Sequence, residues 1–519
     1  MSRGSDSSDG VAPSPPKSGE ESSGTGTIFA GLARHTVIYG IGVIIGRAVS
    51  FLMLPIYTRY LTPADYGVMG LVEMTLDFVA IIGGAKLALG IFRFYHKADS
   101  DLARHQIVAT SFLMIGIMYA LVGTTAFLAA SPLSFLIFGT PDNAILFRIA
   151  AVNLAVSSLT IVPLALARVE DRSVFFVATN LAKLVLLVAL NLLFLVWMGL
   201  GVLGVFLSSL IGNVVVGTFL SLWLFRRISF SFDPASAKAL FRYGFPLMGM
   251  QVATFATTFG DRFFLQGFGD ESIVGLYNLA YQFAFLMVMV GFVPVDQIWG
   301  PRRFRAIREP NSDSVLSRAF ILIHLLVLST AVGIAILVGD VLRIMTTPEF
   351  FSAAAFVPVL LLAYVFQCWA SVQDLGILVS ERTEYLTIAN LVAAAVALVG
   401  FAILVPTYLA WGAAVATLAA FGCRYLLTYT FSQRLYHIRY EWAPVLISLG
   451  WGALLVGSHQ LLIPEMTLVA SMGANIGFLV LFFLGLWFLP VIRGEDRRMV
   501  LRLLVSGIRS AASRVKFLL

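Results

Sequence analysis

Apolar side chains fill most of this chain in long runs that short charged breaks separate. From Val37 to Val491 the runs recur, and many reach the roughly 20 residues that a helix needs to cross the ~30 Å hydrocarbon layer of a bilayer. Reading runs against breaks predicts about 14 membrane-spanning helices. They begin near residues 36, 67, 107, 143, 173, 201, 243, 273, 318, 353, 384, 409, 443 and 467. We therefore expect an all-α integral membrane protein.

Composition agrees with this pattern. Apolar residues make up 59% of the 519 residues and charged residues 12%, a ratio that a water-soluble chain of this length could not keep off its surface. Residues 1–33 differ, because they are rich in Ser, Gly and Pro, and we expect a disordered cytoplasmic tail without the apolar core of a signal peptide. Residues 493–519 alternate basic and apolar side chains, which is typical of an amphipathic helix on an anionic membrane surface.

The basic residues indicate how the spans are directed. When the breaks are numbered alternately, one set holds 27 of the 35 lysines and arginines, whereas the opposite set holds Arg59 and Arg343. Positive charges favour the cytoplasmic side, so both termini are expected in the cytoplasm. The formal net charge of +7 is spread over eight separate segments, which argues against a nucleic-acid partner.

The two halves of the chain resemble each other at a nearly constant offset. At an offset of 208, Tyr66 and Gly67 match Val274 and Gly275, and residues 201–205 match 409–413; at 210, Arg172 matches Arg382. This repeat predicts an N-lobe of six spans over 34–228, a C-lobe of six spans over 229–432, and two extra spans over 433–492. Transporters are often built from such repeats, with the substrate held between the halves.

Several short motifs stand out along the chain, at residues 46–51, Pro55, 59–67, 92–95, 243–246, 260–265, 274–277 and 299–301. Together they resemble polysaccharide flippases of the Wzx type, in the multidrug/oligosaccharidyl-lipid/polysaccharide exporter superfamily, and the resemblance covers roughly residues 34–492. It implies a fold like that of the MATE exporters and of the lipid II flippase MurJ, in a bacterial inner membrane. It also implies export of an undecaprenyl-pyrophosphate-linked oligosaccharide for O-antigen or exopolysaccharide synthesis by alternating access. The expected partners are this substrate, membrane lipids, a polysaccharide polymerase and other assembly proteins.

Cations inside the spans are candidates for binding the pyrophosphate. A charge at mid-helix costs about 2.5 to 3.5 kcal/mol on insertion scales, so it needs a partner, a wet cavity or a nearby membrane surface. Arg47 leads, since it sits near the middle of span 1 and the related lipid II flippases carry a cavity-facing arginine at the matching position. Lys86, Arg93, Arg262 and Lys183 follow. Snorkelling to the surface explains Lys86 equally well.

Carboxylates inside the spans are candidates for coupling transport to an ion. Glu73 and Asp77 lie one helical turn apart and share a face of span 2, where they could bind a proton or a sodium ion. Asp261 stands beside Arg262. Mutual neutralisation of Arg47 and Asp77, which are each 15 residues from Thr62, and ordinary hydrogen bonding between helices are the plain alternatives.

Other possible functions predict different sequence features. A MATE-type exporter of small molecules or cations needs an acidic cavity, against which Arg47, Lys86 and Lys183 argue. A membrane enzyme of polysaccharide synthesis needs an acid or metal site on a large outer loop, and the sequence offers no such loop. Two cysteines and six scattered histidines show no metal-ligand spacing, so neither a metal nor a cofactor is expected. An assembly protein without transport activity would tolerate neutral substitutions of the charges inside the spans.

Overall fold

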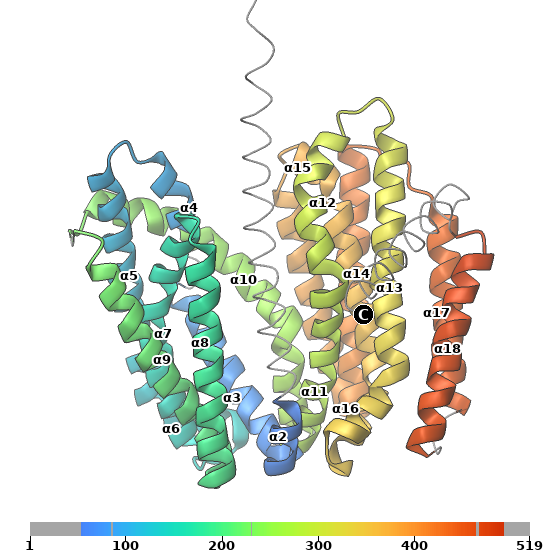
Figure 1. The fold of residues 1–519 in the computed structure, drawn as a ribbon, viewed down its shortest axis with the longest axis horizontal. Helices are drawn as coiled ribbons and strands as arrows, with labels where there is room; N and C mark the ends of the chain where they lie inside the picture. Colours follow the sequence, from blue (N-terminus) through green and yellow to red (C-terminus); the bar gives the residue numbers. More distant parts are fainter. Residues whose placement is uncertain (1–52, 85–86, 230, 463–466, 492–519) are drawn as a thin grey trace, which may run out of the picture.

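The computed structural model describes residues 53–84, 87–229, 231–462 and 467–491, and within these ranges it contains no β-strand. Long helices run in two groups that lie side by side, with a further pair at one edge (Figure 1). The expected tail over 1–33, span 1 and the basic segment over 493–519 lie outside the described residues.

The first group, called the N-lobe, contains the described helices of the first half of the chain. They are α2 (Leu54–Tyr60), α3 (Pro63–Ile82), α4 (Leu89–Phe94), η1 (Tyr95–Lys97), α5 (Asp101–Leu128), α6 (Ala130–Phe138), α7 (Ala144–Val169), α8 (Ser173–Asn191), the π-helical turn η2 (Leu192–Trp197) and α9 (Gly201–Phe225). Helix α7 packs along both α5 and α9, which makes it the centre of this lobe.

The second group, called the C-lobe, begins with the long helix α10 and repeats the pattern. Its helices are α10 (Pro234–Phe268), α11 (Glu271–Met287), the π-helical turn η3 (Val288–Phe292), α12 (Val293–Ala306), α13 (Ser312–Met345), η4 (Pro348–Ala355), α14 (Val357–Gln373), α15 (Leu375–Val379) and α16 (Glu384–Leu435). Helix α10 contacts α4 and α5 of the N-lobe as well as α16, and it crosses obliquely between the lobes in Figure 1.

Helices α17 (Trp442–Leu462) and α18 (Leu468–Phe488) form the edge pair and pack against α13. An apolar cluster that includes Val332 and Phe482 fills the contact. At one end of this contact, the buried Asp340 carboxylate of α13 accepts hydrogen bonds from Ser471 and Asn475 of α18, both at 2.7 Å. Because both oxygen atoms of the Asp340 carboxylate have a donor, these hydrogen bonds help to hold the helix pair α17 and α18 in position on the C-lobe.

Length and composition together identify ten membrane-spanning segments among the described residues, and one of them, α16, covers two expected spans across a kink at Leu409. Helices α3 and α10 are also long enough to span a membrane, but they are more polar than these ten segments. Helix α3, for example, carries Asp65, Glu73 and Asp77. With these two helices, the described residues hold thirteen of the fourteen expected spans. The all-α membrane fold is confirmed.

The repeat extends to the backbone. Gly201 at the start of α9 has φ 56°, and its partner at the offset of 208, Leu409, has φ 46°, so both halves break the helix at the same place. Asp171 and Glu381, related by the offset of 210, have φ 54° and 57°. Glycine adopts positive φ readily, whereas a leucine does so only under strain, so the break at Leu409 is held by the surrounding structure.

The helices that face the other lobe begin with matching caps. Thr62 and Asp65 form a capping box at the start of α3, with Pro63 in the first turn. At the same offset of 208, the Asp270 side chain accepts from the Ile273 backbone N–H and begins α11. Both helices therefore start at equivalent depths, and their first turns meet where the lobes come closest, near α2 and α11 at the lower end of Figure 1.

Candidate functional site

A cavity of about 320 Å³ lies between the two lobes. It is lined by α2, α3, α8 and the start of α9 on one side and by α11 and η3 on the other. Most of its lining is apolar. The lining residues are Met53, Leu54, Tyr57, Tyr66, Met69, Glu73, Leu184, Leu187, Val188, Asn191, Val205, Gln282, Phe285, Leu286 and Met289. Ligand sites typically combine such apolar walls with a few placed polar groups.

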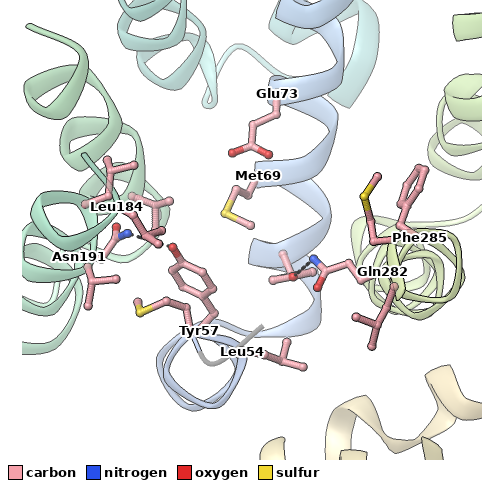
Figure 2. A pocket seen from close by; sticks show the side chains of 15 residues that line it. Leu54, Tyr57, Met69, Glu73, Leu184, Asn191, Gln282 and Phe285 are labelled. Atoms are coloured by element: carbon pink, nitrogen blue, oxygen red, sulfur yellow. Dashed lines mark hydrogen bonds between the residues drawn. The ribbon is translucent and has the colours of Figure 1, made fainter. Parts of the chain in front are cut away.

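Two tyrosine–amide pairs supply most of the polar lining. The Asn191 Nδ2 group donates to the Tyr57 hydroxyl at 2.9 Å and so connects α8 to α2. The Gln282 Nε2 group donates to the Tyr66 hydroxyl and connects α11 of the C-lobe to α3 of the N-lobe. Figure 2 shows Tyr57 and Asn191 on one side of the cavity and Gln282 with Phe285 on the other. The second pair is therefore a direct polar link between the lobes.

Glu73 is the one charged residue among the lining side chains that the structure describes. Its side chain leaves α3 between the two walls, beside Met69 (Figure 2), and it is exposed to the cavity. Asp77, one turn further along α3, is exposed as well. Within the described part of the chain, neither carboxylate forms a hydrogen bond or an ion pair. The predicted acidic pair thus lies on one exposed face of α3, and of the two residues Glu73 lines the cavity.

The lobes close against each other beyond one end of the cavity, which we call the closed end. A Cβ atom on Gly67 would collide with the Glu271 carbonyl oxygen, and a Cβ atom on Gly275 would collide with the Pro63 carbonyl oxygen. The contact is thus reciprocal between two glycines that the repeat makes equivalent. Their lack of a side chain lets α3 and α11 touch backbone to backbone.

Further contacts reinforce the closed end. The Thr58 hydroxyl donates to the Met345 carbonyl oxygen at 3.2 Å, and the Thr347 hydroxyl donates to the Thr58 carbonyl oxygen at 3.3 Å. Tyr66 also meets Phe350 edge to face, with ring centroids 6.1 Å apart. These contacts join α2 and α3 of the N-lobe to the end of α13 and to η4. Opening this end requires all of them to separate.

Arg262 does not line the cavity. It lies in α10 with no exposed surface, and its Nη1 atom is 2.7 Å from Oδ1 of Asp261, which is equally buried. Nη1 also donates to the Thr258 carbonyl oxygen, and the guanidinium carbon lies 3.7 Å from the centroid of the Tyr281 ring. Arg262 and Asp261 therefore form a buried ion pair inside the C-lobe.

Lys183 is also engaged within one lobe. Its Nζ atom donates to Asn213 Oδ1 at 2.6 Å, Asn213 donates in turn to Asn153 at 2.7 Å, and Asn153 donates to Ser209 at 3.0 Å. This chain of polar groups links α7, α8 and α9 across the N-lobe. It satisfies a charge that the sequence alone leaves unexplained.

Arg93 lies far from the closed end, in the short helix α4. It is exposed, and its guanidinium carbon lies 5.1 Å from the ring centroid of Tyr243 in α10. The structure brings together Glu73 and Asp77, and separately Asp261 and Arg262, but it places Arg93 and Lys183 apart from both. Arg47 and Lys86 lie outside the described residues, and the suggested pair of Arg47 with Asp77 therefore does too.

Sequence reasoning missed the neutral lining residues. Tyr57, Tyr66, Asn191 and Gln282 carry no charge, and a single polar residue in an apolar span is unremarkable on its own. The available signal was that Asn191 and Gln282 interrupt otherwise apolar stretches of α8 and α11. Among the described residues, no cluster of three or more His, Cys, Asp or Glu side chains could hold a metal ion.

Comparison with known proteins gives three kinds of match. The family model described as "Polysaccharide biosynthesis protein" matches residues 32–307, just over half of the chain. The succinoglycan biosynthesis transport protein ExoT of Rhizobium meliloti (strain 1021) is 27% identical over 241 residues, which is 45% of this chain and 46% of ExoT. The match thus spans about half the length of that curated relative.

Solved structures share the fold at low sequence identity. The lipid II flippase MurJ in an inward closed conformation superposes with a TM-score of 0.71 at 12% identity, covering 86% of this chain and 98% of MurJ. An inward-facing MATE family multidrug transporter of the MOP superfamily gives 0.60 at 15% identity, covering 82% and 99%. The expected MATE- and MurJ-like architecture is confirmed.

Proposed function

The chain belongs to the polysaccharide biosynthesis protein family, and on that premise we propose that it is a flippase for lipid-linked oligosaccharides in the bacterial inner membrane. The observation that carries this proposal is the cavity between two repeat-related lobes, one end of which is closed by direct contacts between the lobes. Such a cavity suits a substrate that is exposed to each side of a membrane in turn.

Direction follows from the distribution of basic residues. Arg93, Arg172, Arg305 and Arg382 lie in breaks at the end of the molecule opposite the closed end, where α4, α12 and α15 stand in Figure 1. The positive-inside rule assigns this end to the cytoplasm and both termini with it. On this proposal the closed end faces the periplasm, and the cargo enters the cavity from the cytoplasmic leaflet.

We further propose an undecaprenyl-pyrophosphate-linked oligosaccharide as the cargo. Arg47, Lys86 and Arg93 remain our candidates for the pyrophosphate, because guanidinium and ammonium groups bind phosphate oxygens strongly. Glu73 and Asp77 remain our candidates for a coupling proton or sodium ion. Arg262, Asp261 and Lys183 are engaged inside single lobes, and we assign them to packing rather than to cargo.

A MATE-type exporter of organic cations is the second candidate, and one observation favours it. Glu73 is the single charged group among the described lining residues, and a carboxylate in an apolar cavity attracts a cation. Family membership favours the saccharide, and the fold is shared by both kinds of transporter.

Transport into proteoliposomes decides between them. The purified protein is reconstituted, and translocation of a labelled undecaprenyl-pyrophosphate-linked oligosaccharide is compared with that of a fluorescent organic cation. We expect the lipid to move and the cation to stay. The Arg47→Ala variant tests the headgroup site at equal reconstitution, with Arg148→Ala, an exposed arginine at another position, as the matched control. Movement of the cation alone would refute the flippase.

A further inference from the structure

We infer that the closed end of the cavity is a saccharide subsite formed by the two tyrosine–amide pairs, so that the cargo enters with its sugar first and its diphosphate toward the cytoplasm. This inference rests on the proposed function and adds the orientation of the cargo within the cavity.

The Tyr57–Asn191 pair offers both a donor and an acceptor for a sugar hydroxyl. A sugar hydroxyl both donates and accepts, so a site that recognises it needs both kinds of partner. In the Tyr57–Asn191 pair, the tyrosine oxygen accepts the amide N–H and keeps its own proton to donate. Asn191 is 94% buried, since 6% of its surface is exposed, and its Oδ1 atom has no partner within the described part of the chain. A hydroxyl that donates to Oδ1 would satisfy this acceptor.

The Tyr66–Gln282 pair and the apolar lining residues complete the subsite. Gln282 donates to Tyr66 through Nε2, which leaves its oxygen as a further acceptor on the opposite side of the cavity. Leu184, Leu187 and Phe285 form apolar walls between the two pairs. A pyranose ring presents hydroxyls at its rim and C–H groups on its faces, so rim groups meet the amides while the faces meet apolar side chains.

The described lining carries no positive charge that could pair with a diphosphate. None of its residues is basic, and its one charged residue is the carboxylic acid Glu73, which lies about two turns further along α3 from the closed end than Tyr66. A diphosphate at the closed end would be buried in an apolar cavity without a counter-charge, which is costly. The closed end therefore suits the neutral sugar, and the diphosphate lies nearer the opposite end of the molecule, where α4 with the exposed Arg93 stands (Figure 1).

The test compares two lipids that differ only in the sugar. Undecaprenyl pyrophosphate alone and the same lipid carrying oligosaccharide, extracted from the bacterium that makes this protein, are titrated onto detergent-purified protein. Asn191→Leu removes the amide at similar volume, and Tyr57→Phe removes the hydroxyl alone. Asn180→Leu is the control, because Asn180 lies on the same helix, is exposed, and donates to the Phe176 carbonyl oxygen of that helix.

We expect Asn191→Leu and Tyr57→Phe each to weaken binding of the oligosaccharide lipid about tenfold, the scale of one lost hydrogen bond in a buried site. Binding of the sugar-free lipid should be unchanged, and Asn180→Leu should match the wild-type protein with both. Equal losses for both lipids, or no loss for either, would overturn the subsite. If wild-type protein binds neither lipid, the proposed function fails and takes the inference with it.

Discussion

The ion pair of Asp261 and Arg262 gives the sharpest prediction about stability. Both side chains have no exposed surface, and the charged atoms are 2.7 Å apart. Replacing Asp261 by Asn keeps the shape but leaves a guanidinium buried without its counter-charge. Removing one partner of a buried ion pair typically costs about 3 to 5 kcal/mol of unfolding free energy. We expect Asp261→Asn to lose that amount.

Replacing both partners should reverse most of the loss. Arg262→Met alone leaves a buried carboxylate, which can neutralise itself by binding a proton, so we expect a smaller loss than for Asp261→Asn. The double variant buries no charge, and exchanges of this kind are often close to neutral. The coupling energy between the two sites should therefore be about 3 kcal/mol in favour of the double variant.

The assay is thermal unfolding in detergent, followed through intrinsic fluorescence, together with transport by the same preparations. Asp142→Asn, at an exposed turn, is the matched control and should shift stability by no more than about 0.5 kcal/mol. Additive losses in the double variant would refute a buried ion pair. Normal stability with lost transport in Arg262→Met, not restored in the double variant, would instead make Arg262 part of the binding site.

Three further outcomes follow from the structure. Gly275→Leu should push α3 and α11 apart, because the new Cβ atom would meet the backbone of Pro63. A cysteine placed at Thr58 in a cysteine-free background should then react faster with a membrane-impermeant maleimide. An unchanged reaction rate would contradict the closure. Leu409→Gly should raise the unfolding temperature in the same detergent assay by relieving about 1 to 3 kcal/mol of backbone strain, and a lowered unfolding temperature would contradict the strain. Hydrogen bonds from Ser236 and Ala235 hold the pKa of the Asp233 carboxyl below its ordinary value of 3.8, so the stabilisation is complete above that value and is lost as pH falls through the folded pKa. Asp233→Ala should therefore unfold more readily than wild type at pH 7, and a gap that persists unchanged into strong acid would contradict the cap.

Much of the fold could be predicted because its cause is local. A span must be a long apolar helix in a bilayer, and the run lengths record this directly. The predicted match of residues 201–205 to 409–413 recurs in the backbone, since Leu409 has a positive φ like its partner Gly201. The same reading of apolar runs predicted α3 and α10, although charged and polar residues make them less apolar than the other spans.

The site was harder to predict because its cause is not local. The Tyr66–Gln282 link joins residues 216 positions apart, and it exists only once the two lobes are placed against each other. The charge of Arg262 suggested cargo, but burial beside Asp261 depends on how α10 packs into the C-lobe. Sequence pattern showed which side chains are costly in a membrane, and only the packing shows which of them are already satisfied.

The contact of Gly67 and Gly275 is reciprocal, as a self-complementary contact is in a two-fold symmetric dimer. In an ancestral homodimer of two half-length chains, one glycine would have contacted the same glycine of the other chain. A single substitution would then have changed both sides of the contact. In the fused chain each copy mutates separately. The caps already show this divergence, because Thr62 begins one helix and Asp270 the other. A duplication of this kind leaves the two walls of the cavity free to diverge while the glycine contact between them stays reciprocal.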